Sequence, residues 1–310
     1  MKTHMLEWFR RKSVRFFTFL MALVACQGYA LAAANPATEQ SSPRRFLMWK
    51  VTSSTTTVYL LGLVHVGTPD LYPLPAAMES AFAASKVLAV EINIKNVDSS
   101  STLELAQGQG MYEDGDSLSK HISKQTSDAL DEFCSKNGMP REAMELFKPW
   151  LVAMTVTALS VEQGGESQKL GIDLHFLDEV KPPQRIEELE SVEFQLSVFA
   201  SASEQEQQEL LASTLKQAED SKESIQRLQE AYIAGDAGKI EEMLQQESEP
   251  KSFYKKLIED RNIRMAEHVE NYLKGKEQCF VVVGAGHLVG NQGVVKLLEA
   301  RNYHVERVIP

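Results

Sequence analysis

Residues 280–290 read F-V-V-V-G-A-G-H-L-V-G, an apolar run followed by glycines and a histidine. A β-branched apolar run of this kind is typical of a strand that is buried on both faces. Glycine lets the backbone turn sharply, which predicts His287 at the exit of the strand with Gly284 and Gly286 as supporting backbone. Because α/β folds hold ligands at the ends of their strands, this stretch predicts a functional site at one edge of a sheet.

A second segment has the same pattern far upstream. Residues 58–67 read V-Y-L-L-G-L-V-H-V-G, so Gly62 and His65 have the spacing of Gly284 and His287. At the glycine and histidine content of this chain, roughly 0.4 Gly-x-x-His matches are expected by chance, so the spacing alone is weak evidence. The context is stronger, because each match follows a strand-like run and each histidine precedes a glycine. The pattern predicts two imidazoles presented on turns at strand ends.

Residues 87–94, V-L-A-V-E-I-N-I, indicate a further strand that contains Glu91. A carboxylate in so apolar a segment must face water, form a pair or take part in chemistry. Two imidazoles and one carboxylate are sufficient to bind a divalent metal ion and leave one position open for water. We therefore take His65, Glu91 and His287 as the candidate set, with Glu91 either a metal ligand or the base that activates water. The alternative for each histidine alone is a hydrogen-bonded core or turn residue.

The N-terminus indicates export. Five basic residues and an apolar run at residues 16–25 precede small residues, and Ala-Leu-Ala at 30–32 fits a signal-peptide cleavage site. We expect a signal peptide over residues 1–32, a flexible leader over 33–45, and a periplasmic or secreted protein. The alternative is a bacterial lipoprotein box, L-V-A-C, which would place a lipid anchor on Cys26. The apolar run is too short to span a membrane as a stable helix.

Composition limits the classes of partner. The chain has 310 residues, of which 43% are hydrophobic and 24% charged, an ordinary globular composition. Without residues 1–32, 27 basic and 42 acidic residues remain, a formal net charge of −15. This charge argues against nucleic acid or an anionic membrane surface as a partner. Two cysteines also remain, Cys134 and Cys279, which we expect to be buried thiols, with a disulfide between them as the alternative.

The order of the apolar patterns predicts a mixed α/β fold (α+β) for residues 46–310, which form a single domain. Its central sheet comes from the N- and C-terminal segments, and a large helical insertion covers residues 186–274. Strands are expected at 46–51, 57–64, 87–94, 171–177, 280–284 and 303–308, and helices at 76–85, 127–136, 141–147, 149–161 and 293–300. The strand at 171–177 would carry Asp173 and His175 on one face, because strand side chains alternate.

Several blocks in this order resemble the TraB/GumN family (TraB/PrgY/GumN), which is related to the Tiki proteins and more distantly to erythromycin-esterase-like hydrolases. The resemblance extends from residue 46 to residue 308. The matching blocks are residues 59–67, Glu91, 147–150 (F-K-P-W), 171–173 with 176–177, 186–196 (ending L-E-S-V-E-F-Q-L), 261–262 with 265–266, and 283–290.

The resemblance implies a fold like that of the Tiki and erythromycin-esterase-like proteins. It also implies that His65, Glu91 and His287 are the active residues and metal ligands, with Arg261 as an orienting or substrate-contacting residue. Because Tiki proteins are described as metal-dependent proteases that use manganese or cobalt, the resemblance implies one of these ions, with zinc as a further option. The implied function is an exported metal-dependent hydrolase, expected to be a peptidase, with a peptide or small molecule as its substrate. The alternatives are a metal-free ester or amide hydrolase that uses Glu91 and a histidine, and a non-catalytic protein that binds a peptide or signal.

Overall fold

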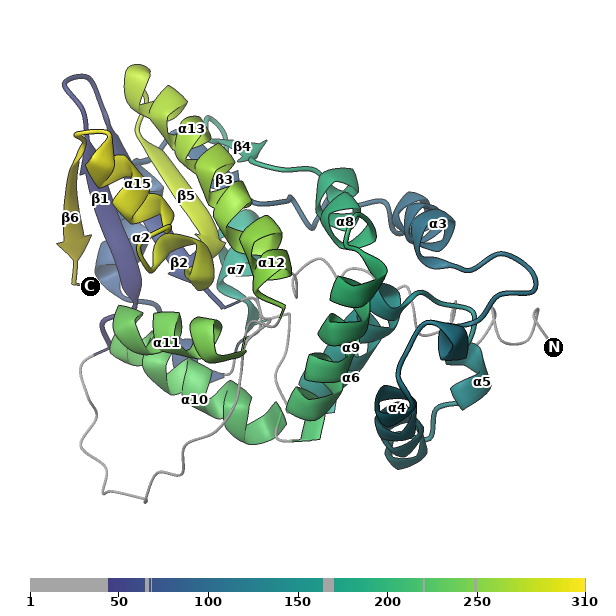
Figure 1. Cartoon of the computed structure of the whole chain (residues 1–310). Helices are drawn as coiled ribbons and strands as arrows, with labels where there is room; N and C mark the ends of the chain where they lie inside the picture. The colour runs from purple at the N-terminus through teal and green to yellow at the C-terminus, as the bar shows by residue number, and fades with distance from the viewer. Residues whose placement is uncertain are drawn as a thin grey trace, which may run out of the picture.

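The computed structural model describes residues 44–64, 67, 69–163, 170–219, 221–247 and 250–309. Within these ranges a six-stranded mixed sheet in the order β4-β3-β5-β2-β1-β6 lies between helices, and a lobe of further helices extends from one end of the sheet (Figure 1). The predicted mixed α/β class is confirmed.

The antiparallel half of the sheet is built from the two ends of the chain. Strands β1 (Leu47–Thr52) and β2 (Thr57–Leu63) form the predicted opening hairpin, with Leu47 opposite Gly62. Strand β6 (His304–Val308) pairs antiparallel with the outer side of β1. The hairpin thus joins the C-terminal strand to the centre of the sheet.

The parallel half positions the site. Strand β5 (Cys279–Gly284) lies between β2 and β3 (Val87–Val90), and β4 (Arg185–Glu188) pairs with the far side of β3. Every residue of β3 and β5 is buried, as their apolar sequences predict. Because parallel strands end at the same edge, the residues after β3, β4 and β5 emerge side by side there.

Helices cover both faces of this sheet (Figure 1). On one face, α2 (Ala76–Ala84) and α7 (Ile172–Glu179) contribute Phe82 and Phe176, whose rings pack against Phe280 of β5. Helices α13 (Asp260–Lys274) and α15 (Val294–Ala300) lie on the other face. The remaining helices near the sheet are α10 (Ser221–Ala234), α11 (Ala237–Glu247) and the short α14 (Ala285–Leu288).

The helical lobe has a hydrophobic core of its own. It contains α3 (Ser99–Gly110), α4 (Lys124–Lys136), α5 (Arg141–Met144), α6 (Pro149–Gln163), α8 (Val192–Ala200), α9 (Glu204–Glu219) and α12 (Lys251–Tyr254). A 3-10 turn at Leu118–Lys120 also belongs to the lobe, and a second one, Pro69–Leu71, lies near the sheet. A π-helical turn, Lys255–Glu259, leads from α12 into α13. The buried apolar residues form two clusters, one around the sheet and one within this lobe.

At three of the places where the described chain passes from one cluster to the other, a charged side chain is buried. Val90 belongs to the sheet cluster and Ile92 to the helical cluster, with Glu91 between them. The other two such crossings lie at residues 189–196 and 258–265, and each also carries a buried charged side chain. The boundary between the two cores is therefore where the polar residues of the interior collect.

The structure corrects several expectations. Residues 171–177 do not form a strand: they lie in α7, whose apolar positions Ile172, Phe176 and Leu177 recur at helical spacing and are all buried. Strand β3 ends at Val90, so Glu91 follows the strand instead of lying within it. The region 186–274 was expected to be helical, but it begins within the edge strand β4. The residues of this strand are polar except for one, which suits an exposed or partly buried sheet edge.

Cys134 and Cys279 are both free, buried thiols, as expected. Cys134 lies in the helical cluster and Cys279 in the sheet cluster, so the alternative of a disulfide is wrong. Burial raises the pKa of the Cys279 thiol to about 11.

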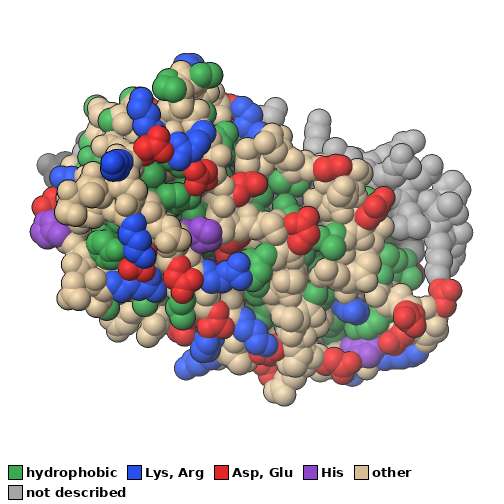
Figure 2. Space-filling view, turned by 90° about the horizontal axis from the view of Figure 1, so that it is seen from above, with side chains coloured by type: hydrophobic (Ala, Val, Ile, Leu, Met, Phe, Trp, Pro, Cys, Tyr) green, Lys and Arg blue, Asp and Glu red, His purple; other side chains and the backbone are tan. Residues whose placement is uncertain are grey.

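The outer surface carries charges of both signs. In Figure 2, acidic and basic side chains are interspersed over the face seen from above. Among the described residues, no helix has the length and apolar character needed to cross a membrane.

Candidate functional site

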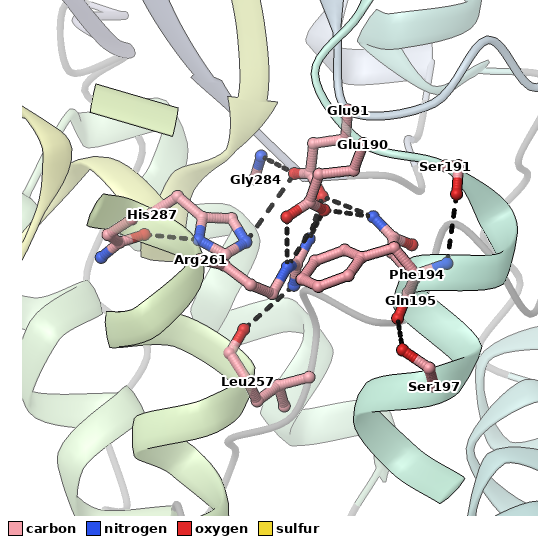
Figure 3. A network of polar contacts seen from close by, with 11 residues as sticks. Glu91, Glu190, Ser191, Phe194, Gln195, Ser197, Leu257, Arg261, Gly284 and His287 are labelled. Atoms are coloured by element: carbon pink, nitrogen blue, oxygen red, sulfur yellow. Dashed lines mark hydrogen bonds and ion pairs between the residues drawn. The ribbon is translucent and has the colours of Figure 1, made fainter. Parts of the chain in front are cut away.

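Glu91, Arg261 and His287, three of the residues that the sequence singled out, meet at the boundary between the two cores (Figure 3). Glu190, which the sequence analysis did not select, joins them. His287 is fully buried, Arg261 is 1% exposed, and the two glutamates are 6–7% exposed. His65 lies outside the described residues.

Both oxygens of the Glu91 carboxylate have defined neighbours. Oε1 accepts the backbone N–H of Gly284 at 2.7 Å and lies 3.9 Å from Nε2 of His287. Oε2 accepts a hydrogen bond from Arg261 at 2.7 Å and one from Gln195 at 3.3 Å. The carboxylate thus has one oxygen on the histidine side and one on the arginine side.

Asn262 sets the orientation of the His287 ring. Its Oδ1 lies 2.6 Å from Nδ1 of His287, and its Nδ2 donates to the carbonyl of Gln292 at 2.8 Å. Since that carbonyl accepts from Nδ2, Oδ1 is the acceptor toward the ring and Nδ1 carries the proton in the neutral imidazole. Nε2 then presents its lone pair toward Glu91. A second hydrogen bond of this kind is typical of histidines that bind a metal or accept a proton.

Arg261 joins the two carboxylates. It donates to Glu190 through Nε at 3.0 Å and through one terminal nitrogen at 2.6 Å, and the same nitrogen reaches Glu91. The other terminal nitrogen donates to the carbonyl of Leu257 at 3.0 Å, inside the π-helical turn. Burial alone would lower the pKa of Arg261, but the charges of Glu91 and Glu190 outweigh it and the pKa is raised. The guanidinium therefore stays charged. The π-helical turn that binds it is a kind of irregularity that is frequent at functional sites.

Three residues of this network were missed: Glu190, Gln195 and Asn262. Gln195 comes from α8, where its Nε2 donates to Glu190 at 2.9 Å, and it is 1% exposed. Glu190 lies two residues after β4, at the same sheet edge as Glu91. Its position would have indicated a site residue if β4 had been recognised as a strand. Glu190 and Gln195 both lie in the L-E-S-V-E-F-Q-L block, one of the blocks that resemble the family.

The glycines of the two Gly-x-x-His segments allow close packing. A Cβ on Gly62 would lie 3.1 Å from the Cα of Ala285, and one on Gly286 would lie 3.0 Å from Leu244. Gly284 has an ordinary negative φ of −52° and contributes its N–H to Glu91. Gly62 thus allows close approach of β2 to α14, and Gly286 allows close approach of α14 to α11, whereas at Gly284 the backbone angle itself does not require glycine.

Asp173 and His175 lie on α7, so the expectation that they share a strand face is wrong. His175 Nε2 pairs with Glu79 of α2 at 2.9 Å and is partly exposed. Asp173 is buried and lies near Tyr72. Burial, followed by the charges of Asp173 and Glu79, raises the pKa of Tyr72 to about 12.

The geometry of His287 and Glu91 fits two positions around a divalent ion. Histidine nitrogen and carboxylate oxygen are ordinary metal ligands, and these two atoms, 3.9 Å apart, are the ones that would hold an ion after a small adjustment. Within the described residues, no group of three or more His, Cys, Asp and Glu side chains could hold a metal ion. The expected third ligand, His65, is outside those residues.

A match to a family model over most of the chain shows the family. The model of the TraB/PrgY/gumN family matches residues 47–307, which include β1, the site and most of β6. This chain belongs to the TraB/PrgY/gumN family. The site described above is therefore a site of a TraB/PrgY/gumN protein.

Similar curated proteins include the uncharacterized protein YbaP of Escherichia coli (strain K12) and the protein of the same name from Shigella flexneri. Each is 22% identical over 242 residues, which cover 77% of this chain and 87% of the relative. No solved structure matches the chain.

Proposed function

We propose that this protein is a hydrolase that cleaves a peptide bond, with Glu91 and His287 as the reacting groups. The observation that carries the proposal is the buried pair formed by Glu91 Oε1 and His287 Nε2 at 3.9 Å, with the proton of His287 held on the opposite nitrogen by Asn262. A gap of this length between an acceptor nitrogen and a carboxylate suits a water molecule held by both, which is the nucleophile that hydrolysis requires.

The surrounding residues support these roles. Arg261 keeps the Glu91 carboxylate ionised, so the carboxylate is able to accept a proton from water. Glu190 and Gln195 hold the Arg261 side of the network, and neither reaches His287 in the contacts described above. The Gly284 N–H fixes Oε1 on the histidine side. Activity thus depends on Glu91 and His287 directly and on the others through position.

We further propose that the hydrolase depends on a divalent ion. In this version the ion would take the place of the bridging water between His287 Nε2 and Glu91 Oε1 and would also be held by His65; it would lower the pKa of the water bound to it and polarise the carbonyl of the substrate. Manganese, cobalt and zinc are the ions to test, because histidine and carboxylate suit all three.

The test measures metal content and cleavage together. The purified chain is assayed for bound metal and for cleavage of a peptide library, with and without chelator, beside the variants Glu91→Gln and His287→Gln. We expect chelator-sensitive cleavage and a loss of about 10²–10⁴-fold in Glu91→Gln. Unchanged cleavage in either variant overturns the role of this pair.

A metal-free hydrolase is the second candidate. Both oxygens of Glu91 already accept hydrogen bonds, and a guanidinium 2.7 Å away opposes the approach of a cation. In this version Glu91 acts as the base for hydrolysis of an ester or amide. Cleavage that survives the chelator but is lost in Glu91→Gln would select it, whereas recovery of an unmodified bound peptide after long incubation would favour a binding protein instead.

Export is a separate proposal that rests on residues 1–32, which lie outside the described residues. Basic residues, an apolar run and Ala-Leu-Ala at 30–32 support removal of a signal peptide. Expression of the whole chain in a bacterial host, fractionation and N-terminal sequencing test it. A mature protein that begins at residue 33 is expected, and a lipid on Cys26 would select the anchored alternative.

A further inference from the structure

A cleft lies beside His287, on the side of its ring that faces Asn262. It has a volume of about 600 Å³ and is open to solvent. Its walls come from α11, α12, the π-helical turn and the loop that follows α14, with Asn262 at the boundary between the cleft and the buried histidine. A volume of this size is in the range of small-molecule sites, which is about 300–1,000 Å³.

The charge of the lining is strongly negative. Glu241, Glu242 and Glu259 line the cleft, and Lys251 is the one basic residue in its described lining. Neither Glu241 nor Glu259 forms a salt bridge with a described residue: Glu241 accepts a hydrogen bond from Gln245, a neutral side chain, at 3.0 Å. Two carboxylates thus face the cleft without a cationic partner from the described part of the chain.

The two carboxylates act on the same part of the cleft. Tyr254 stands in the lining, and its pKa is raised to about 12 by burial first and then by the charges of Glu259 and Glu241. Both carboxylates therefore lie within electrostatic reach of one phenol, although one comes from α11 and the other from the π-helical turn. Tyr254 and the buried Ile258 add an apolar wall beside the charges. An aromatic ring beside carboxylates favours a cation on an apolar stem.

The cleft also has a direct connection to the candidate active site. Asn262 lines it while holding Nδ1 of His287, and the carbonyl that accepts from Asn262 belongs to Gln292, another lining residue. Gly290 has a φ of 79°, a conformation that favours glycine, and a Cβ there would lie 2.9 Å from the Glu241 carboxylate, so glycine lets this loop lie close to α11. The position of His287 and the shape of the cleft therefore depend on the same loop.

We propose that this cleft is a binding site for a cationic group on an apolar stem, such as the alkylammonium or guanidinium group of a lysine or arginine side chain. Glu241 and Glu259 bind the charge, and Tyr254 and Ile258 contact the stem. The proposal goes beyond hydrolysis, because the cleft is separated from Glu91 by His287 and Asn262, and it stands whether or not the buried pair turns over a substrate.

The experiment compares two probes that share an apolar stem and differ by the terminal ammonium group. Binding of Nα-acetyl-lysine amide and of its neutral analogue Nα-acetyl-norleucine amide to the purified chain is measured by titration calorimetry at low ionic strength. We expect the lysine derivative to bind about tenfold more tightly, since a hydrogen bond to a charged group contributes at least that factor. We also expect this preference to decrease as salt is added.

Two variants locate the site. The double variant Glu241→Gln/Glu259→Gln should lose the preference, while Glu113→Gln/Glu132→Gln, which makes the same change in net charge at exposed positions elsewhere, should keep it. Backbone amide resonances of Gly290, Asn291 and Gln292 should shift when the lysine derivative is added. Equal binding of the two probes, a preference that survives in the first double variant, or shifts confined to other residues each overturns the proposal. The hydrolase proposal is judged separately, by cleavage in the Glu91 and His287 variants.

Discussion

Oε1 of Glu91 lies 3.9 Å from Nε2 of His287, although the two residues are 196 positions apart and follow different strands. The parallel register of β3 and β5 brings them together, since Val90 pairs with Val282 and the chain continues from both strands at the same edge. The other oxygen of Glu91 binds Arg261. One carboxylate thus lies both beside His287 and in an ion-pair network at the boundary between the two hydrophobic cores.

The tautomer of His287 should depend on Asn262. In Asn262→Ala the ring loses the acceptor of its Nδ1 proton, so we expect a mixture of tautomers where the unaltered protein has mainly the Nδ1–H form. Nitrogen chemical shifts of the imidazole, measured by NMR, report this directly. Asn271→Ala, an exposed position on the same helix, is the matched control and should leave the signals unchanged. Identical spectra for both variants would contradict the assignment.

Arg261 should be essential for stability. In Arg261→Met, Glu91 and Glu190 remain buried without their counter-charge, which should lower the free energy of unfolding by about 3–5 kcal/mol. Because burial and mutual repulsion then favour protonation of one carboxylate, the deficit should be largest at neutral pH and should shrink as the pH falls. Urea unfolding at several pH values measures it.

The control for Arg261 lies one turn further along α13. Arg264 is exposed and stacks on the ring of Phe194 at 4.0 Å, so Arg264→Met should cost about 0.5–1 kcal/mol and show no such dependence on pH. Equal losses for the two arginines would show that the buried network contributes nothing specific.

Much of the site was accessible from the sequence, because its residues interrupt apolar patterns. Glu91 interrupts an apolar run, and His287 follows one at a glycine, so both stood out before any fold was known. Glu190 and Gln195 did not, since glutamate and glutamine are common in the polar helical region around them. Their burial arises from tertiary contacts, because Glu190 binds Arg261 and Gln195 donates to Glu190 and Glu91, and no local pattern encodes these contacts.

The errors in the fold have a similar origin. In I-D-L-H-F-L, apolar and polar residues alternate as in a strand, but Ile172 and Phe176 also lie on one face of a helix, and packing on Phe280 decides in favour of α7. Strand β4 has the sequence R-I-E-E, and its strand conformation depends on pairing with β3. Tertiary contacts overrode local propensity in both places.

Stability at acid pH should depend on the contact between α9 and the π-helical turn. Lys256 donates to Glu206 at 2.9 Å. This hydrogen bond, the largest cause, together with those from Ser203 and Ser252 lowers the pKa of that carboxyl from 4.5 to about 2. Because the folded-state pKa is the lower one, the contribution is present above pH 4.5 and is lost as the pH falls toward about 2. We expect Lys256→Met to cost about 1 kcal/mol near neutral pH and nothing near pH 2. Lys124→Met, which removes an exposed pair with Asp128, should show a smaller effect.

Two glycine substitutions should have opposite effects on stability. A methyl group on Gly62 meets the backbone of Ala285 at 3.1 Å, so Gly62→Ala should force α14 away from β2 and lower the free energy of unfolding by about 1–3 kcal/mol. Gly108 in α3 has nothing within 4 Å of an added Cβ, and Gly108→Ala should raise that free energy by about 0.5–1 kcal/mol. Chemical denaturation measures both. Since α14 carries His287, Gly62→Ala alone should also alter the imidazole signals of His287, and a variant that is destabilised with those signals unchanged would show that close packing of β2 does not position the histidine.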